Sequence, residues 1–320
     1  MHDPHEHSFK KLFRLIQKAE RILICAHQKP DGDTLGATTS LFNWLVREQK
    51  DVSAFCKNTI PDQFCFLDSA HCISHDPHIF AQSFDLIIVM DSGNLQYCGI
   101  EDLLAQHESS PTIVNIDHHP TNKQFGDVNI IITTASSTAE IVARFYSANS
   151  IHVDHKMATS ILTGLLTDTW NFSNGATNAE TMNIGSRMLS AGARFSDIQQ
   201  NIHRVHRVDT LHLWGRVLDR LRVHPSLDVA VTYILAKDLV GLSEDAESGI
   251  SNFLNSMLGA HETILVLTEK LDGTVKGSLR SIRRDISLLA QSLGGGGHAR
   301  AAGFTIQGRI QETEAGPRIV

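Results

Sequence analysis

The sequence is short of basic residues, and this shortage argues against one class of protein. Its 28 Lys and Arg are outnumbered by 35 Asp and Glu, which gives a formal net charge of −7. Proteins that hold long nucleic acid do so through a broad basic surface that contacts many phosphates. The charge balance disfavours that mode of binding and leaves room for a short anionic ligand held by a few arginines and metal ions.

Paired cysteines and long apolar runs are also missing. The five cysteines include no C-x-x-C pair, and their odd number does not suggest a disulfide framework. No uninterrupted apolar run reaches the length of a membrane span, and the N-terminus lacks the apolar stretch of a signal peptide. These absences predict a protein of a reducing compartment, the cytoplasm, that does not bind membranes.

What remains is an ordinary globular composition with room for more than one domain. The chain has 320 residues, of which 42% are hydrophobic and 20% are charged. The pattern of apolar and polar residues changes along the chain and indicates where one part ends and the next begins. We expect an N-terminal domain over residues 1–194, a polar helical connector over 195–223 and a second domain over 224–320.

Strands alternate with helical stretches in the first domain. Short apolar runs predict strands at residues 22–26, 52–56, 86–90, 112–116 and 128–132. Helical spacing follows the first of these runs over residues 34–49 and recurs later, for example over residues 156–166. The alternation favours an α/β fold with a doubly wound, mostly parallel sheet that helices cover on both faces.

The second domain shows a different pattern. Strands are predicted at residues 229–235, 263–269, 274–281 and 304–307, with a helix over 285–293. This order favours a smaller α+β domain, and we expect a cleft between the two domains. Residues 308–320 are polar and lack the apolar helix that we expect to close such a domain.

Polar side chains follow three of the strands predicted for the first domain. His27, Asp91 and the triplet Asp117-His118-His119 each stand where an apolar run stops. Because ligands of parallel sheets bind outside the carboxyl ends of the strands, we expect these residues to converge in space. Convergence of residues far apart in the chain is the main physical argument for a site here.

Carboxylates and imidazoles at one sheet edge are typical of a metal centre. Mn²⁺ and Mg²⁺ accept carboxylate oxygens, and the softer Mn²⁺ also accepts imidazole nitrogen. Two ions about 3.5–4 Å apart need a bridging ligand and terminal ligands on each side. Asp91 suits the bridge because it follows a central strand, and Asp168 is expected just past the end of its helix. The candidate ligands are His27, Asp31, Asp33, Asp91, His118 and Asp168.

Taken one at a time, these residues have simpler interpretations. Asp31 and Asp33 would serve as turn and helix-cap residues, and His27 would be a buried core histidine. The occurrence of four such segments in one chain favours a two-metal hydrolytic site.

Two features of the second domain suggest contacts to a phosphate. Gly295, Gly296 and Gly297 let the backbone approach an anion and present N–H groups to it, and His298 adds a further donor. The alternative is a flexible linker. In the strand over 274–281, alternation places Ser278 and Arg280 on one face together with Lys276, which a solvated strand face would also explain.

The motifs, in this order, resemble those of the DHH phosphoesterases. They are HQKPDGDTLGA at residues 27–37, DSG at 91–93, DHH at 117–119 and GLLTDT at 164–169. GSLRS at 277–281 and GGGGHARAAG at 294–303 are similar to the C-terminal domain associated with that family. The resemblance runs from about residue 9 to residue 307, nearly the whole chain.

The resemblance implies a phosphodiesterase or exonuclease that uses two Mn²⁺ ions, or Mg²⁺ or another divalent ion, on short RNA or DNA. Its substrates would be nanoRNA, dinucleotides and the phosphate of pAp. One ion would be held by His27, Asp31 and Asp91. The other would be held by Asp33, Asp91, His118 and Asp168. His119 would contact the scissile phosphate, Asp117 would orient its neighbours, and Arg280 would grip a substrate phosphate.

Other functions stay open at this point. Related two-domain proteins cleave cyclic dinucleotides, so a phosphodiesterase of the cyclic di-AMP type is one alternative. A nucleotide-binding regulator without turnover is another, and a scaffold protein would need neither the metal set nor Arg280. The sequence does not decide between the substrates, the polarity of cleavage or a homodimeric state, and neither long duplexes nor membranes are expected partners.

Overall fold

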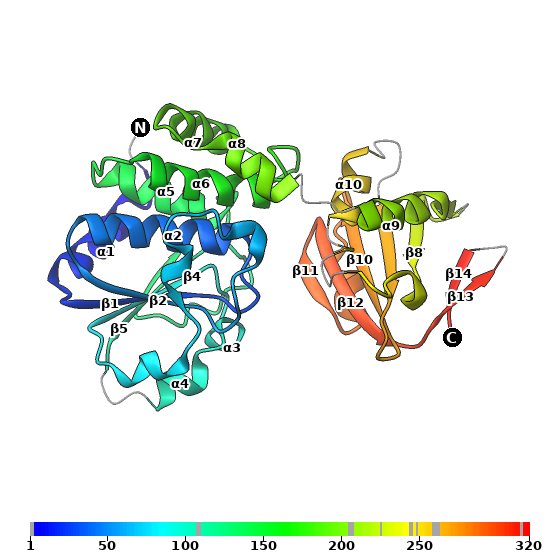
Figure 1. The fold of residues 1–320 in the computed structure, drawn as a ribbon, viewed down its shortest axis with the longest axis horizontal. Helices are drawn as coiled ribbons and strands as arrows, with labels where there is room; N and C mark the ends of the chain where they lie inside the picture. The colour runs from blue at the N-terminus through cyan, green and yellow to red at the C-terminus, as the bar shows by residue number, and fades with distance from the viewer. Residues whose placement is uncertain are drawn as a thin grey trace. The chain divides into compact units, whose positions relative to one another are not determined.

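The computed structural model describes residues 3–106, 110–203, 208–224, 226–242, 246–247, 249–257, 263–313 and 316–320. They form two compact units, Met1–Val205 and His206–Val320 (Figure 1). The connector expected over residues 195–223 is divided between them. The short helix α8 (Phe195–Ile198) and the π-helical turn Gln199–His203 lie in the first unit, and α9 (Val208–Asp219) belongs to the core of the second.

The first unit contains a sheet of six parallel strands in the order β3-β2-β1-β4-β5-β6. The strands are β1 (Arg21–Ala26), β2 (Asp51–Phe55), β3 (Ile73–Ser74), β4 (Leu86–Met90), β5 (Thr112–Asp117) and β6 (Val128–Ile131). From the central pair β1 and β4, successive strands are added outward: β2 and β3 on the side of β1, and β5 and β6 on the side of β4. The carboxyl ends of β1 and β4 therefore flank the switch point at which such sheets bind ligands.

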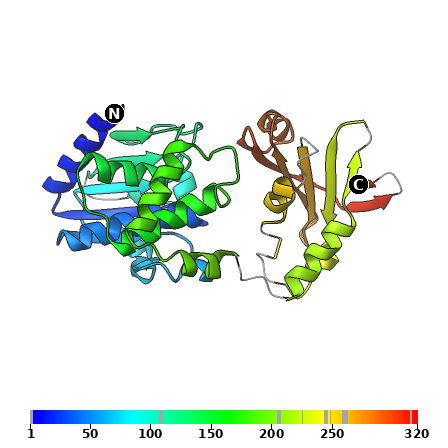
Figure 2. The same cartoon turned by 90° about the horizontal axis from the view of Figure 1, so that it is seen from above.

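Helices cover both faces of this sheet (Figures 1 and 2). One face carries α1 (Glu6–Lys18), α2 (Gly32–Arg47), α5 (Thr138–Ala148) and α6 (His155–Asp168), with α7 (Ala179–Ser190) packed on α6. The other face carries α3 (Leu95–Cys98), α4 (Glu101–Ala105) and the 3-10 turn Pro77–Ala81. Two further 3-10 turns, Asp62–Phe64 and Ala70–Cys72, contribute Phe64 and Ala70 to the core of the first face. The predicted doubly wound fold is confirmed.

Two glycines let α2 and α6 approach closely. A β-carbon on Gly36 would lie 2.4 Å from the carbonyl oxygen of Ser160 and 2.9 Å from the nitrogen of Gly164. A β-carbon on Gly164 would lie 2.5 Å from that of Ala139 and 2.9 Å from Oδ1 of Asp33. Since no real side chain tolerates such distances, glycine at both positions sets the helix separation and thereby the distance between polar residues at their ends.

The second unit contains a mixed sheet in the order β11-β12-β10-β9-β8-β7. The strands are β7 (Arg222–His224), β8 (Val229–Ile234), β9 (Thr263–Glu269), β10 (Thr274–Ser281), β11 (Gly296–His298) and β12 (Ala301–Gln307). Only β8 and β9 run parallel within this sheet. Its helices are α9, α10 (Ile250–Met257) and α11 (Ser287–Ser292), with a 3-10 turn at Ala236–Asp238. The predicted α+β class is confirmed, although α10 was not foreseen.

As the sequence indicates, the described residues at the end of the chain form no closing helix. In place of a closing helix, residues 308–320 contribute the hairpin strands β13 (Ile310–Thr313) and β14 (Gly316–Ile319). Ile310 and Ile319 turn their side chains into the core on one face of the second sheet. Two apolar side chains on a hairpin thus supply the cover that a helix was expected to provide. Within the part of the chain that the structure describes, no helix combines the length and apolarity needed to cross a membrane.

Candidate metal centre

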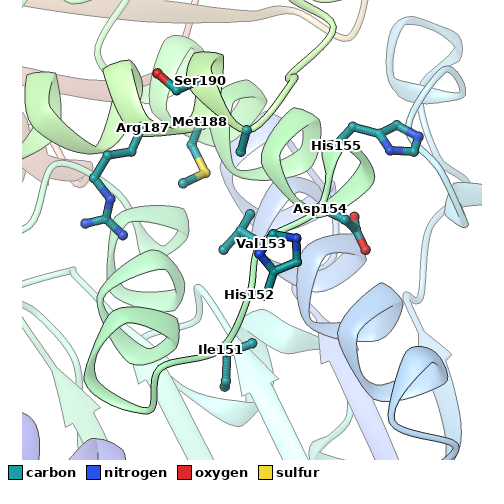
Figure 3. Close-up of a pocket in the computed structure, with 9 residues that line it drawn as sticks. Ile151, His152, Val153, Asp154, His155, Arg187, Met188 and Ser190 are labelled. Carbon is teal, nitrogen blue, oxygen red and sulfur yellow. The ribbon is translucent and has the colours of Figure 1, made fainter.

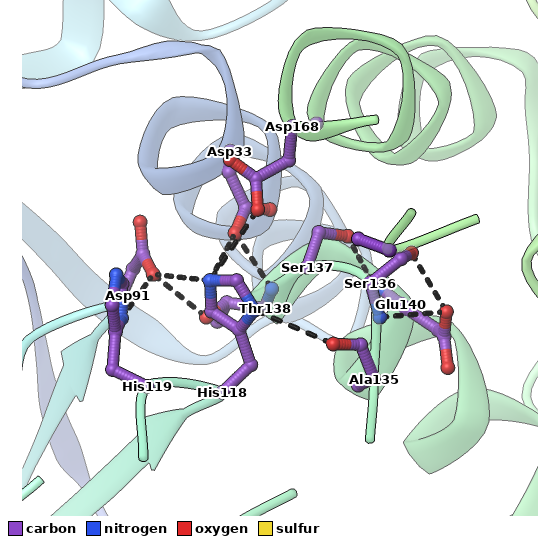
Figure 4. A network of polar contacts seen from close by, with 12 residues as sticks. Asp33, Asp91, His118, His119, Ala135, Ser136, Ser137, Thr138, Glu140 and Asp168 are labelled. Carbon is purple, nitrogen blue, oxygen red and sulfur yellow. Dashed lines mark hydrogen bonds and ion pairs between the residues drawn. The ribbon is translucent and has the colours of Figure 1, made fainter. Parts of the chain in front are cut away.

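The six predicted ligands come together at the carboxyl edge of the first sheet. They are His27 after β1, Asp31 and Asp33 at the start of α2, Asp91 after β4, His118 after β5 and Asp168 at the end of α6. In two groups of three, the ligand atoms all lie within 4.8 Å of one another: His27, Asp31 and Asp91, then Asp33, His118 and Asp168. Figure 4 shows the second group with Asp91 beside it.

Asp91 belongs to the first group and also faces the second. Its Oδ2 is 3.4 Å from Nε2 of His27, and its Oδ1 is 3.7 Å from Nε2 of His118. The buried carboxylate also accepts hydrogen bonds from Oγ1 of Thr34 at 2.6 Å and from Oγ1 of Thr138 at 3.0 Å. One carboxylate therefore faces both candidate positions, and two threonine hydroxyls fix its orientation.

The backbone at Asp91 is itself unusual. Its φ is 55°, in the left-handed region that non-glycine residues seldom occupy. Such a conformation costs of order 1 kcal/mol and persists where the surrounding structure enforces it, often at functional sites. Here the turn after β4 carries this cost and places the carboxylate between His27 and His118.

The first group is organised by backbone contacts. Nδ1 of His27 donates to the carbonyl oxygen of Gln28 at 2.7 Å, which directs Nε2 toward Oδ1 of Asp31 at 3.9 Å. Asp31 is the N-cap of α2, and the same Oδ1 accepts from the N–H groups of Asp33 and Thr34. The cap role of Asp31 is thus confirmed, and the same carboxylate also faces His27, so the cap does not prevent it from serving as a ligand.

In the second group, Nε2 of His118 faces two carboxylates. It lies 3.4 Å from Oδ2 of Asp168 and 3.9 Å from Oδ2 of Asp33, while Nδ1 is 3.4 Å from the carbonyl oxygen of Ala135. Asp168 is the last residue of α6, so its predicted place just past the helix end was wrong. The helix continues past Leu166, its last apolar residue, and the backbone N–H of Thr169 still donates to the carbonyl oxygen of Leu165.

Asp33 is fully buried and held by the start of another helix. Its carboxylate oxygens accept from the N–H groups of Thr138 at 2.6 Å and Ala139 at 2.8 Å, the first residues of α5. These amides have no partner within their own helix, and the positive end of the helix dipole favours the negative charge. The contact joins residues more than a hundred positions apart in the chain, so no local sequence pattern predicts it.

A buried glutamate orders the turn that precedes α5. Oε2 of Glu140 accepts from the backbone N–H of Ser136 at 3.1 Å and from its hydroxyl at 2.8 Å (Figure 4). The same oxygen accepts from the hydroxyl of Thr181 at 2.9 Å. The same turn supplies the carbonyl of Ala135 to His118 and the donors of Thr138. That this turn supports the site was not predicted from the sequence.

The triplet begins with the last residue of β5, and its members differ in position: His118 faces the second group, and Asp117 accepts hydrogen bonds from both histidines. Asp117 is buried, and its Oδ1 accepts from the N–H of His118 at 2.8 Å and from Nδ1 of His119 at 2.7 Å. Nδ2 of Asn122 donates to its Oδ2 at 2.6 Å. His119 is also within ligand distance of Asp91 and His118. The contact with Asp117 fixes the tautomer of neutral His119 with the proton on Nδ1.

Proton affinities in the site are strongly shifted. Burial lowers the pKa of His27, but its hydrogen bond to Asp91 and the charge of that carboxylate outweigh burial and raise the pKa to about 9. For His119, burial is likewise outweighed, here by the hydrogen bond to Asp117, and its pKa also rises to about 9. The imidazoles in turn hold the pKa of Asp91 well below its usual range, despite burial.

Two further carboxylates shift in the opposite direction. Burial, together with the charges of Asp91 and Asp168, raises the pKa of Asp33 well above its usual range. Burial and the charges of Asp31 and Asp91 do the same for Asp168. Crowded carboxylates of this kind are relieved by a cation. With oxygen and imidazole donors on one edge, the residues fit a divalent metal ion.

The predicted phosphate contacts of the second unit share one face of its sheet. Arg280 of β10 and His298 of β11 both stand opposite Ala301 of β12. Ser278 and Gly296 both stand opposite Gly303 in the same way. Because directly opposed residues project to the same face, Ser278, Arg280 and His298 are neighbours on it.

The glycine run is in part an edge strand, β11 over Gly296–His298, and is therefore not a flexible linker there. A β-carbon on Gly295 would lie 2.0 Å from the carbonyl oxygen of Gly303, and Gly297 has a φ of 135°. Close packing on β12 and a left-handed backbone therefore require glycine at these two positions. No local pattern predicted this strand, because it is defined by pairing with β12, which comes later in the chain.

A separate hollow of about 670 Å³ lies on the first unit, away from the candidate metal centre (Figure 3). It is lined by Ile151, His152, Val153, Asp154, His155, Arg187, Met188, Ser190 and Ala191. His155 begins α6 and Asp168 ends it, so the length of the helix separates the hollow from the site by about 20 Å. The hollow is therefore not part of the metal centre.

Comparison with known proteins matches both parts of the chain to protein families. Residues 21–165 match "DHH family, N-terminal domain", and residues 228–316 match "DHHA1 domain". Curated relatives include the bifunctional oligoribonuclease and PAP phosphatase NrnA of Thermus thermophilus, 27% identical over 90% of this chain and 84% of the relative. The protein of the same name from Bacillus subtilis is 24% identical over 92% of both.

Other matches concern a second activity and the fold. The cyclic-di-AMP phosphodiesterase GdpP of Geobacillus thermodenitrificans is 25% identical over 90% of this chain but only 45% of its own length. Among solved structures, an exopolyphosphatase-related protein from Bacteroides fragilis superposes with a TM-score of 0.86 at 24% identity. It covers 93% of this chain, with 91% of its own covered, and shows the same fold.

Proposed function

We propose, from the premise that this chain belongs to the DHH family, that it hydrolyses short oligonucleotides and the phosphate of pAp with two Mn²⁺ ions bound at the first sheet. DHH proteins are phosphoesterases, and the site can hold metal. The identity and number of the ions and the choice of substrate are the parts we propose.

One observation carries the proposal of two ions. Oδ2 of Asp91 faces His27, and Oδ1 faces His118, so a single carboxylate serves two separate ligand groups. A site for one ion has no need of a carboxylate directed to both sides. Two-metal hydrolases have a bridging ligand of this kind between ions about 3.5–4 Å apart.

The ions, when bound, would supply activation of water and compensation of the charge on the phosphate oxygens. The chain's own residues would do the rest. Thr34 and Thr138 hold the bridging carboxylate, and Asp117 holds His119 through Nδ1. The hydrogen bond from Nδ1 to Asp117 leaves the other ring nitrogen of His119 to contact a phosphate or leaving oxygen.

The choice of short substrates rests on the second unit and on the relatives. Arg280 presents a forked donor that suits phosphate, and His298 lies at the same level of the sheet. The relatives named for oligoribonuclease and PAP phosphatase activity match this chain over about nine tenths of its length. A cytoplasmic location and a homodimer remain predictions.

The match to GdpP supports a second candidate, hydrolysis of a cyclic dinucleotide. This chain corresponds to less than half of that protein, so we rank the activity below the first. Rates on a dinucleotide, pAp and cyclic di-AMP, compared side by side with Mn²⁺, separate the two.

Removal of the metal tests the proposal. Treatment with EDTA should abolish hydrolysis of a dinucleotide, and titration with Mn²⁺ should restore it best at two ions per chain. Metal content measured by mass spectrometry gives the stoichiometry independently of activity. Activity that survives chelation, or full recovery at one ion per chain, would refute the two-metal assignment.

A further inference from the structure

The second unit contains a pocket that extends well beyond Arg280. Its volume is about 880 Å³, within the usual range for small-molecule sites. Along β10 it follows one face, from Arg280 through Ser278 to Lys276. Four residues of extended strand separate its two basic ends by about 13 Å. This span exceeds a phosphate group and suits a whole nucleotide.

Arg280 marks one end of the pocket as a place for an anion. Its Nε donates to Oδ1 of Asn252 at 2.6 Å and its Nη1 to the carbonyl oxygen of Leu279 at 2.8 Å. Both partners are neutral, and no acidic side chain among the described residues lies within ion-pair distance of it. Burial alone lowers its pKa. A half-buried guanidinium without a counter-ion favours an incoming phosphate.

At the other end of the pocket lies Glu247, whose two carboxylate oxygens differ in their contacts. Its Oε1 accepts from Nζ of Lys270 at 2.9 Å and from Nζ of Lys276 at 3.1 Å. Its Oε2 is buried and has no hydrogen-bond partner in the described part of the chain. A buried acceptor left in this state is costly unless a ligand donates to it.

The wall beside these polar groups is apolar. Leu239, Leu242 and Val266 line the same pocket as Glu247 and Lys276. A flat aromatic ring packs well on such a surface, while a sugar or a bare phosphate gains little from it. The combination of an apolar wall, an acceptor and an ammonium donor matches the face and edge of a nucleobase, which carries donors and acceptors side by side.

We propose that this pocket is a nucleotide subsite in which Arg280 holds a phosphate while Glu247 and Lys276 bind the edge of its base. The inference rests on the proposed function and extends it from a phosphate contact to recognition of the nucleoside. It implies that the second unit distinguishes a nucleotide from other small phosphates. All four common bases present a donor beside an acceptor, so we expect binding to depend on the base being present more than on its identity.

Calorimetric titration of the full chain in EDTA tests this, because chelation prevents ions in the first unit from holding the phosphate. The probes are AMP, UMP, ribose 5-phosphate and inorganic phosphate. We expect both nucleotides to bind at least tenfold more tightly than ribose 5-phosphate. Glu247→Leu should remove most of this difference and leave the affinity for ribose 5-phosphate within twofold, as expected for a lost hydrogen bond to a charged group.

Controls separate a local effect from a general one. Glu312→Leu removes an exposed glutamate that accepts from Tyr233 and does not line the pocket, so it should change nothing. Lys276→Met provides a second test if Glu247→Leu fails to fold, which circular dichroism would reveal. It should reduce nucleotide affinity several-fold with the ribose 5-phosphate affinity unchanged.

Two results would overturn the inference: equal affinity for nucleotides and ribose 5-phosphate, or an equal loss of both in Glu247→Leu. Neither result would contradict the proposed function as long as the chain hydrolyses a dinucleotide in a Mn²⁺-dependent reaction. If no hydrolysis is found on any substrate while the nucleotides bind as expected, the proposed function fails and the subsite stands.

Discussion

Gly36 and Gly164 face each other where α2 packs on α6, and a β-carbon on Gly36 would come within 2.9 Å of the backbone nitrogen of Gly164. The contact lies one helical turn from the ends that carry Asp33 and Asp168. Separation of the helices therefore sets the separation of two candidate ligands.

Gly164→Ala should damage the metal centre although it adds a single methyl group. The new carbon would lie 2.9 Å from Oδ1 of Asp33, so either the carboxylate or the helix must move. Overpacking of this kind costs about 1–3 kcal/mol. We expect weaker Mn²⁺ binding by titration calorimetry and a lower melting temperature.

Gly215→Ala in α9 is the matched control for this change. A β-carbon there meets no atom within 4 Å, so the higher helix propensity of alanine should stabilise the protein by about 0.5–1 kcal/mol. Equal behaviour of the two variants would contradict the role assigned to the α2–α6 contact.

Asp91→Asn should abolish hydrolysis while the fold is retained. Asparagine tolerates the left-handed backbone at this position and preserves the side-chain shape, but it removes the charge directed at both ligand groups. We expect the rate on a dinucleotide to fall by at least about a thousandfold, with fewer than two ions bound per chain. Asp51→Asn, at an exposed ion pair with Arg21, is the control and should retain activity. Substantial turnover by Asp91→Asn would exclude a bridging role.

Arg280→Ala should affect substrates according to their size. A charge-assisted hydrogen bond to phosphate contributes about 1.5–3 kcal/mol, so kcat/KM on a dinucleotide should fall roughly ten- to a hundredfold. A small artificial phosphodiester that cannot reach the second unit should be hydrolysed at nearly the original rate. The exposed Arg318→Ala is the control. Equal losses on the two substrates would argue against a phosphate contact by Arg280.

Stability of the metal-free chain should fall as pH rises from about 6.5 to about 9. The pKa values of His27 and His119 are raised to about 9 in the folded state, so that state binds more protons than the unfolded chain across this range. Stability from this source is complete below pH 6.5 and is lost as pH passes 9. Urea unfolding in EDTA at several pH values measures the slope.

Mn²⁺ should oppose this decline, because a metal ion competes with protons for the same side chains and binds better as they leave. The same unfolding series with Mn²⁺ in place of EDTA is the comparison. A metal-free stability that stays constant or increases over this range would contradict the raised pKa values.

The convergence of the candidate ligands could be predicted because each of them lies near the end of a strand or the end of a helix. His27 and Asp91 follow apolar runs directly, and the parallel sheet implied by those runs places their ends together. The hydroxyls of Thr34 and Thr138 could not be predicted in the same way. Their role depends on the approach of α2 and α5 to Asp91, and this tertiary contact leaves no local pattern.

The second unit was harder to predict for a related reason. The segment Gly296–His298 pairs with β12, and glycine is required there by the neighbouring strand more than by a loop conformation. Glu247 was not predicted as a binding residue, because a single glutamate in a sequence is usually exposed to solvent. Its significance comes from two lysines on other elements that engage one oxygen and leave the second without a partner.

The left-handed backbone of Asp91 also restricts how this protein can change over evolutionary time. Glycine and asparagine are the residues that best tolerate such a conformation, and each is one nucleotide away from an aspartate codon. Either replacement would remove the charge that faces both ligand groups and leave Arg280 and Glu247 of the other unit untouched. Under the functions proposed above, a single mutation is thus a short route from a hydrolase to a protein that binds nucleotides without cleaving them.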